Sequence, residues 1–348
     1  MENETKISSS INRKRNFTFV FLTGLILLTL AFALFSSRKP DKKINEISSS
    51  MKSIAAPDFL VRAFPDTDWS KADQSLTDAL NGGPGKDGIP ALNEPKFDTL
   101  DTWKQAGDVN AIVIQDGDNT KVYPYNILVW HEIINDTVGG VPIAVTFCPL
   151  CGSAVVYDRR LPDGVSTFGV SGALVESNMI MYDRLSETLW QQSTGRALAG
   201  KYFGQELTRI SFQLLTIDGV REKYPHARVV SERTGYFRDY SRNPYGSYDT
   251  NEDFIFHPSM QDVRYPAKTI FVVFTIDDTS ISVPWLSFRS DEVYTTEVNG
   301  QKIMLQKKDG ELVVLDAQNK NIPFYFEMWF SWAVRHQQDG RVFDPSKQ

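Results

Sequence analysis

Cysteine and histidine are scarce in this chain of 348 residues, which has two cysteines and four histidines. A small fold held together by several disulfides is therefore excluded. A metal site with four cysteine ligands is excluded too, because it needs a second Cys-x-x-Cys pair beside Cys148 and Cys151. Any metal at this pair must take its other ligands from His, Asp, Glu or solvent.

Positive charge is also scarce outside the N-terminus. Residues 1–43 carry eight Lys or Arg against three acids, which leaves 29 basic and 40 acidic residues, a net charge of -11, for the rest. We do not expect this acidic part of the chain to bind nucleic acid, because phosphate backbones bind to basic surfaces. The hydrophobic content of 41% is enough for a well-buried core, which argues against a disordered chain.

One long apolar segment without charge lies near the N-terminus. It comprises residues 17–35 and follows a basic segment at residues 1–16. A helix of that length just crosses a bilayer core of about 30 Å. We expect a single-pass anchor in the cell membrane, although Ala31-Phe32-Ala33 leaves a cleaved signal segment open. Residues 36–58 then form a polar tether, and residues 59–348 form an extracytoplasmic main domain.

Two stretches of the main domain match each other in sequence. Residues 111–158 align with residues 271–316, and Pro124 falls on Pro284. Each stretch predicts a strand, a turn, a short strand, a helix begun by proline, a glycine turn and a hairpin. Chance matching of common residues is the alternative. The pattern predicts an internal duplication that gives the main domain two related halves.

Short β-type runs punctuated by glycine fill most of the remaining sequence. Helical patterns are confined to stretches near residues 125–135, 212–223 and 326–335. We therefore predict an α+β fold that is mainly antiparallel β with short helices.

The cysteine pair lies in a turn that lengthens one of the predicted hairpins. Residues 146–158 read TFCPLCGSAVVYD, whereas the matching turn in the second stretch is a shorter, polar KKDGE. The pair follows a strand, so activation by a helix N-terminus is not indicated. Three interpretations stay open: a metal knuckle, a redox couple and a structural disulfide.

Two histidines are candidates to complete a metal site with Cys148 and Cys151. His131 lies in WHEIIND, and His257 follows an aromatic strand and precedes a proline. The metal would be a transition metal such as zinc, iron or copper. The alternative for each histidine is a structural side chain that binds no metal.

Three familiar catalytic motifs fail on their own requirements. Lys86 is followed by Asp87, so no phosphate loop forms. Asn135 stands where a metalloprotease helix starting at His131 needs a second histidine. Ser171 lacks the final glycine and the helix of a nucleophile elbow.

A further group of residues joins charge to aromatic surface. Asp183 and Arg184 are adjacent, and Trp190 and Gln192 follow closely. The charged residues suit a buried ion pair, and the other two suit a polar pocket that binds a cofactor or small ligand. The alternative is a hairpin stabilised by an ion pair and a packed tryptophan.

Six ordered motifs resemble a prokaryotic family known only as a domain of unknown function, of the DUF 3179 kind, which carries an FCPLCG signature. Its members are exported or attached to membranes. The motifs in this chain are GGPGKDGIPAL, YPYNILVWHEIIND, VTFCPLCGSAVVYDR, FGVSGAL, MYDRLSETLWQQSTGRALAG and NPYGSYD. The resemblance covers most of the chain from about Gly82 onward.

The resemblance implies a set of distinctive positions without giving them roles. They are His131, Glu132, Asn135, Asp136, Cys148, Cys151, Asp183, Arg184, Trp190 and Gln192.

Our leading hypothesis is a membrane-anchored protein that uses the cysteine pair for redox or metal chemistry, with a small molecule or a redox protein as partner. We expect Cys148 to be the more exposed sulfur and Cys151 to be its resolving or co-ligating partner. The alternative is a non-enzymatic binding module in which the pair is a structural disulfide. A pocket near Trp190 would then hold the ligand.

Overall fold

The structure is a computed structural model that describes residues 56–117 and 119–347. Contacts group Ala55–Gln348 into one compact unit. The predicted anchor at residues 17–35 and most of the predicted tether lie outside the described residues. Within the described part, no helix is long and apolar enough to cross a membrane.

Strands dominate the described chain, and every helix is short. The helices are α3 (Asp58–Ala63), α4 (Tyr125–His131), α5 (Ile217–Lys223), α6 (Trp329–Arg335) and the 3-10 turns η1 (Gln74–Asp78), η2 (Leu100–Thr102), η3 (Trp285–Ser287) and η4 (Pro345–Lys347). The strands of the first half are β1 (Leu80–Asn81), β2 (Leu92–Asn93), β3 (Phe97–Thr99), β4 (Asn110–Ile114), β5 (Lys121–Pro124), β6 (Ile133–Val138), β7 (Val141–Cys148), β8 (Ser153–Asp158), β9 (Arg160–Leu161), β10 (Gly164–Val165), β11 (Phe168–Val175) and β12 (Asn178–Asp183). The later strands are β13 (Leu189–Gln191), β14 (Ala197–Ala199), β15 (Gln213–Thr216), β16 (Arg228–Val230), β17 (Ile270–Ile276), β18 (Thr279–Pro284), β19 (Val293–Val298), β20 (Gln301–Lys308), β21 (Glu311–Leu315), β22 (Tyr325–Met328) and β23 (Gly340–Val342).

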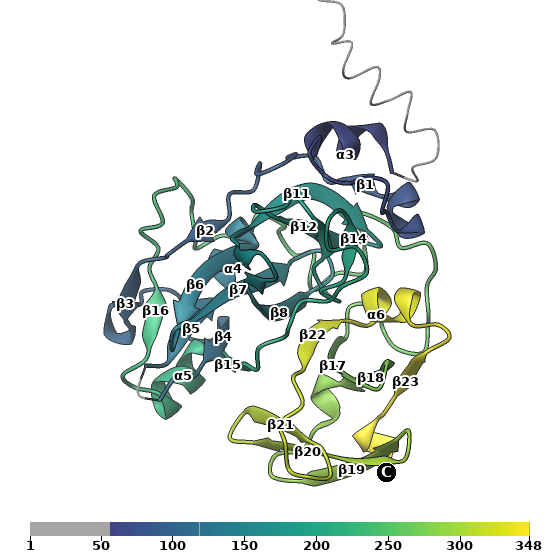
Figure 1. Cartoon of the computed structure of the whole chain (residues 1–348). Helices are drawn as coiled ribbons and strands as arrows, with labels where there is room; N and C mark the ends of the chain where they lie inside the picture. The colour runs from purple at the N-terminus through teal and green to yellow at the C-terminus, as the bar shows by residue number, and fades with distance from the viewer. Residues whose placement is uncertain (1–55, 118, 348) are drawn as a thin grey trace, which may run out of the picture. The chain divides into compact units, whose positions relative to one another are not determined.

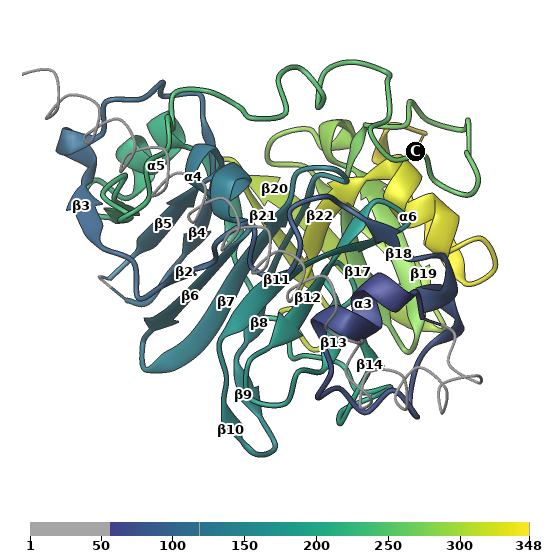
Figure 2. The same cartoon turned by 90° about the horizontal axis from the view of Figure 1, so that it is seen from above.

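An eight-stranded sheet in the order β2-β6-β7-β8-β22-β17-β18-β23 runs through the middle of the fold (Figure 1). Figure 2 shows β6, β7 and β8 side by side, followed by β22, β17 and β18. Two five-stranded sheets have the orders β15-β4-β5-β16-β3 and β1-β11-β12-β13-β14, and β19-β20-β21 form a smaller one. Pairing is antiparallel except at β2–β6, β5–β16 and β18–β23. The mainly antiparallel β prediction is thus confirmed in its coarse form.

The two matching stretches form the same elements in the same register. Ala111 pairs with Pro124 in β4–β5, and Phe271 pairs with Pro284 in β17–β18, as the sequence alignment of the stretches requires. The meander β6-β7-β8 of the first stretch has its counterpart in β19-β20-β21. That this likeness arose by duplication stays a prediction.

The likeness continues beyond the stretches that the sequence comparison matched. The unit β15-α5-β16 follows the first stretch, and β22-α6-β23 follows the second. β15 pairs antiparallel with β4, as β22 does with β17, and β16 lies parallel to β5, as β23 does to β18. In addition, β22 bonds to β8, so strands of both stretches share the eight-stranded sheet.

The first helix of the repeat is shorter than predicted. α4 ends at His131 because the next residue, Glu132, has a φ of 57°, in the left-handed region. Ile133 then begins β6, whose Ile133 and Ile134 suit a strand. The prediction that the helix continues to residue 135 was therefore wrong, and this change of direction decides where Glu132 lies.

Side chains alternate between the two faces of the eight-stranded sheet, and each face contributes to a separate hydrophobic core. Val145 and Phe147 of β7 belong to one core, with Val272 and Phe326. Ala144 and Cys148 belong to the other, with Tyr325, Trp190 and Met181. Cys148 and its neighbour Phe147 therefore point to opposite faces of the sheet.

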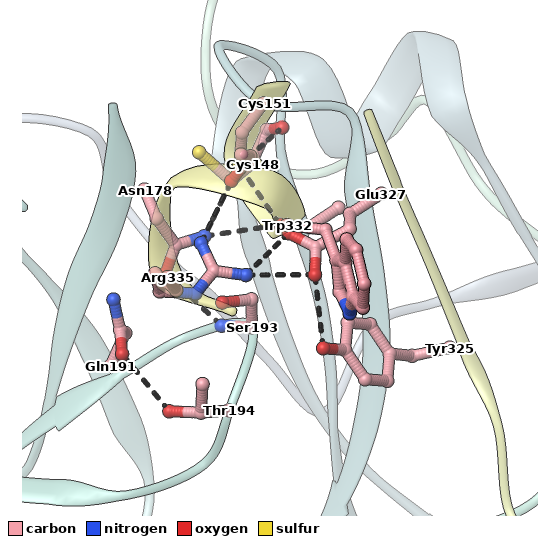
Figure 3. A network of polar contacts seen from close by, with 12 residues as sticks. Cys148, Cys151, Asn178, Gln191, Ser193, Thr194, Tyr325, Glu327, Trp332 and Arg335 are labelled. Atoms are coloured by element: carbon pink, nitrogen blue, oxygen red, sulfur yellow. Dashed lines mark hydrogen bonds and ion pairs between the residues drawn. The ribbon is translucent and has the colours of Figure 1, made fainter. Parts of the chain in front are cut away.

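A buried ion pair ties β22 to α6 beside the second core (Figure 3). Glu327 is fully buried, and the side chain of Arg335 is only 10% exposed. Nη2 of Arg335 donates to both carboxylate oxygens of Glu327, at 2.7 and 2.6 Å. The hydroxyl of Tyr325 donates to the same carboxylate at 2.9 Å. The charge of Glu327 is thus compensated inside the fold.

We predict that Arg335→Met lowers the free energy of unfolding by about 3–5 kcal/mol, because it leaves the carboxylate of Glu327 buried without a cation. Arg289→Met is the matched control, since Arg289 forms an exposed ion pair with Glu292 at 3.5 Å and should change stability little. Urea unfolding of the full-length chain measures both. Equal losses in the two variants would contradict the importance of the buried pair.

Candidate functional site

The turn between β7 and β8 holds both cysteines. Cys148 and Ser153 form the last pair of the two strands, so residues 149–152 make the turn. Gly152 has a φ of 59°, and a Cβ at this position would lie 3.0 Å from Cγ of Met328. The backbone N–H of Met328 donates to the carbonyl of Cys151 at 2.8 Å. Glycine thus allows the turn to pack directly against β22.

Both sulfurs are closed off from solvent and occur as thiols. Cys148 is 1% exposed and Cys151 is 0% exposed. Both cysteines belong to the second core, and the expectation that Cys148 is the more exposed sulfur stays a prediction. Reaction at either sulfur therefore requires a small reagent or an opening of the turn.

Cys151 has neutral hydrogen-bond donors on two sides. Nδ2 of Asn178 lies 3.1 Å from its sulfur, and Oγ of Ser153 also lies 3.1 Å away. Burial by itself raises the pKa of Cys151, but hydrogen bonds from Cys148, Ser153 and Asn178 outweigh burial and lower the pKa to about 7. Cys151 is therefore the sulfur that ionises near neutral pH.

Cys148 behaves in the opposite way. Burial raises its pKa well above the usual value, and the hydrogen bond to Cys151 together with the charges of Cys151 and Glu132 raises it further. Its sulfur also lies 3.6 Å from the carbonyl oxygen of Ser177, an alternative acceptor for its single proton. One sulfur of the pair thus favours the thiolate and the other the thiol.

Gln192 organises the donors around Cys151. Its Oε1 accepts from Nδ2 of Asn178 at 3.0 Å and also contacts Oγ of Ser153, whose single proton can point either to this oxygen or to the sulfur of Cys151. Its Nε2 donates to Oγ1 of Thr146 at 2.8 Å. Gln192 is fully buried, so these bonds fix Asn178 and Ser153 toward the sulfur. The structure thereby brings one of the predicted cofactor-binding residues to the cysteine pair.

A strained turn presents Asn178 to the site. Glu176 and Ser177 connect β11 to β12 with φ values of 50° and 61°. Two consecutive positive φ angles are typical of turns that prefer Asn-Gly, and neither residue here is glycine. Oγ of Ser177 donates to the carbonyl of Phe256 at 2.6 Å, which helps to hold this conformation. Such strain often accompanies functional sites.

Glu132 is a further titratable group beside the cysteines. Its side chain is 5% exposed, and its Oε1 accepts a hydrogen bond from the hydroxyl of Tyr245 at 3.2 Å. Burial raises the pKa of Glu132 to about 8, against the hydrogen bond from Tyr245, and the nearby charge of Cys151 raises it further. A carboxyl group that titrates near neutral pH suits proton transfer.

The sequence contained a signal for this position of Glu132. β6 and β7 pair antiparallel around Gly139-Gly140, with Val138 opposite Val141. Counting back along this hairpin places Glu132 opposite Phe147, where the amide of Phe147 donates to the carbonyl of Glu132 at 2.8 Å. Sequence reasoning assigned this segment to a helix and so missed that its backbone pairs with the strand that ends at Cys148.

The buried ion pair of β22 and α6 belongs to the surroundings of Cys151 (Figure 3). The charge of Glu327 raises the pKa of Cys151, and the charge of Cys151 is one of the causes that raise the pKa of Arg335. Nε of Arg335 and Oγ of Ser193 are buried and have no hydrogen-bond partner among the described residues. Such groups commonly bind a buried water or a small polar molecule.

The two candidate histidines lie in other environments. His131 is fully buried, with Nδ1 2.8 Å from the carbonyl of Pro90 and Nε2 2.8 Å from the hydroxyl of Tyr240. Burial lowers its pKa to about 4. His257 is exposed beside Phe254. Across residues 56–117 and 119–347, no group of three or more His, Cys, Asp or Glu is arranged to hold a metal ion.

The predicted Asp183 and Arg184 pair is not formed. Oδ2 of Asp183 accepts from Nε1 of Trp190 at 3.0 Å, whereas Arg184 bonds to Asp87 at 2.6 Å. Adjacent residues on β12 and its extension point to opposite sides, which separates the two charges. Trp190 is 1% exposed and packs in the second core against Phe168. Asp183 and Trp190 thus stabilise the hairpin, and Trp190 shares the second core with the cysteines.

Comparison with known proteins identifies a family but no characterised relative. The model of a family described as "Protein of unknown function (DUF3179)" matches residues 86–323. No curated protein and no solved structure matches the chain.

We predict that the thiolate absorbance near 240 nm of the full-length chain rises with a midpoint at about pH 7. Ser153→Ala should raise this midpoint by about one pH unit, because a hydrogen bond to a charged group contributes about 1.5–3 kcal/mol and one unit corresponds to 1.36 kcal/mol. Ser171→Ala, which changes a buried serine bonded to the carbonyl of Ile180, is the control. An unchanged midpoint in Ser153→Ala would contradict the stabilised thiolate.

We predict that Glu132→Gln flattens the pH dependence of stability. The folded pKa of about 8 lies above the unfolded value of about 4.3, so the stability contributed by this group is full below pH 4 and is lost as pH rises to about 8. Relative to the wild type, Glu132→Gln should become more stable between about pH 5 and 8. Urea unfolding at several pH values measures the difference. The exposed Glu297→Gln should instead follow the wild-type curve.

Proposed function

Because the chain belongs to the family "Protein of unknown function (DUF3179)", whose description assigns no reaction, we propose a function from the site itself: Cys148 and Cys151 form a buried thiol–disulfide redox couple. The observation that carries this proposal is the sulfur of Cys151, which is held by Ser153 and Asn178 at 3.1 Å and ionises near neutral pH.

The ionisation of Cys151 supports its role as the attacking sulfur. A thiolate is the nucleophile in thiol–disulfide exchange, and exchange is fastest when the pKa lies near the ambient pH. Cys148 retains its proton at that pH, because burial and its neighbours raise its pKa. Cys151 therefore reacts first, and Cys148 acts as the resolving thiol.

The reaction uses a small disulfide as the oxidant. The thiolate of Cys151 attacks one sulfur of this disulfide, forms a mixed disulfide and releases the first thiolate. Cys148 then loses its proton and attacks the sulfur of Cys151, which forms the Cys148–Cys151 disulfide and releases the second thiolate. Two electrons pass from the protein to the small disulfide. Burial of both sulfurs favours a small reagent over a folded protein as the direct oxidant.

Glu132 takes the proton that Cys148 loses. The carboxylate of Glu132 raises the pKa of the Cys148 thiol, whereas the pKa of Glu132 itself is raised by the charge of Cys151. The pKa of Glu132 is about 8, so the carboxylate fraction that accepts the proton grows from pH 7 to pH 8. In the reverse direction, protonated Glu132 returns the proton to Cys148.

A metal at the pair is supported less well than redox exchange. The described residues place no third His, Asp or Glu ligand with the two cysteines, and His131 is bonded to Pro90 and Tyr240. Two thiolates alone would have to hold the metal.

The setting of the site belongs to the same proposal. We propose that the two corresponding stretches arose by duplication and that the first one gained the cysteine turn, since β20 and β21 form a hairpin with a polar turn instead. We further propose that residues 17–35 anchor the chain in the cell membrane with the main domain outside the cytoplasm, where disulfides persist.

Redox titration tests the proposed function. The full-length chain is equilibrated in glutathione buffers of defined potential, denatured and labelled with a maleimide that adds mass to each free thiol. We predict that Cys148 and Cys151 are oxidised and reduced together, so that the protein carries either two maleimide labels or none. The reduction potential of the pair should lie above about -300 mV, as expected of a working redox couple rather than a structural disulfide. Cys148→Ser should form a mixed disulfide near pH 7, whereas Cys151→Ser should react far more slowly.

Two results would overturn the redox proposal. A potential below about -300 mV would make the pair a structural disulfide. About one equivalent of metal in the purified wild type, lost when both cysteines are changed to serine, would make the pair a metal site.

A further inference from the structure

A cleft of about 450 Å³ lies on the other side of the cysteine turn, and Pro149 and Gly152 form part of its wall. Cys148 and Cys151 do not line it, because β7 directs Phe147 to this face and Cys148 to the opposite one. Small-molecule sites usually have volumes of about 300–1,000 Å³. The cleft is therefore large enough for a ligand of its own.

Corresponding residues of the two matching stretches line this cleft. In the alignment of the two stretches, Tyr125 corresponds to Trp285, and Phe147 corresponds to Lys307. All four of these residues line the cleft. The cleft thus lies where the two stretches meet. The two walls differ in charge, because Lys307 places an ammonium group on one wall where Phe147 places a phenyl ring on the other.

Both walls present aromatic rings. Tyr125 stacks on Phe147 with ring centroids 4.2 Å apart and an interplanar angle of 30°. On the other wall, Trp285 meets Phe326 edge to face at 5.2 Å. Pairs of aromatic rings attract each other in stacked or edge-to-face arrangements. This lining favours a planar aromatic ligand.

Lys307 is the lysine of the cleft whose ammonium group has no hydrogen-bond partner among the described residues. Its Nζ lies 3.8 Å from the ring centroid of Trp285, and its side chain is half-buried. Within the described residues it forms no ion pair, and burial lowers its pKa. A half-buried ammonium group without a counter-ion favours an anionic ligand.

The other charged residues of the cleft are accounted for. Lys268 donates to the carbonyl of Tyr248, to Oδ1 of Asn251 at 3.1 Å and to the carbonyl of Asp253 at 2.5 Å. Asp249 and Asp309 are exposed at the rim, where water screens their charge. The electrostatic preference inside the cleft is therefore set by Lys307.

We propose that this cleft binds a small aromatic carboxylate, with its ring between Tyr125 and Trp285 and its carboxylate paired with Lys307. The proposal does not depend on the redox role of the cysteines.

Isothermal titration calorimetry of the full-length chain tests the proposal with 2-naphthoate and its uncharged analogue 2-naphthamide. The wild type should bind 2-naphthoate more tightly by about tenfold, the effect of one charge-assisted contact. Lys307→Met keeps the apolar stem and should abolish this preference, whereas Lys307→Arg should retain it. Lys308→Met is the matched control, because Lys308 is exposed on the same strand and does not line the cleft.

Trp285→Ala should weaken both ligands equally, since it removes ring contact without changing charge. Near-UV circular dichroism checks that each variant is folded. Equal binding of the two ligands by the wild type, an equal loss of preference in Lys308→Met, or no binding of either ligand at millimolar concentration would overturn the proposal.

Discussion

The alternation of side chains along β7 is the constraint on which the two sites depend. Phe147 and Cys148 are neighbours in sequence, yet the pleat sends them to opposite faces of the eight-stranded sheet. The sulfur enters a closed core lined by Trp190 and Met181, and the phenyl ring enters the cleft. A shift of this strand by one residue would exchange the two environments.

The stabilisation of Cys151 comes mainly from neutral donors rather than from a helix or a nearby free cation. Ser153 and Asn178 point at the sulfur, and Gln192 holds both of them. The charge of Arg335 is already matched by Glu327. This arrangement resembles an oxyanion site more than an electropositive thiol site, because dipoles fixed by a buried network supply the stabilisation.

The sequence predicted the broad fold because it contained local signals. Alternating β-branched runs, prolines before short helices and glycine turns gave a mainly antiparallel β chain and the two matching stretches. It failed where one residue changed the direction of the backbone, as at Glu132, whose left-handed conformation ends α4 early. Adjacent charges in sequence also proved misleading, since Asp183 and Arg184 bond to different partners.

The candidate site was only partly predictable for a related reason. Cys148, Cys151 and Gln192 were chosen from sequence and lie together, but Ser153 and Asn178 carry no distinguishing signal in the sequence. Their role follows from the pairing of β7 with β8 and from the strained turn before β12, which are properties of the folded chain. Lys307 likewise could not be selected from the sequence, because its place in the cleft follows from its contact with the ring of Trp285 in the folded chain.

The cysteine turn has one backbone but two faces. Cys148 and Cys151 face the core, while Pro149 and Gly152 face the cleft, and Met328 holds the turn by a hydrogen bond to Cys151. Formation of a disulfide between the two sulfurs and binding of a molecule in the cleft therefore both act on the turn at residues 149–152. Thermodynamic linkage makes any such influence mutual: whatever the oxidation of the pair does to affinity in the cleft, occupancy of the cleft must do, by the same factor, to the equilibrium between dithiol and disulfide.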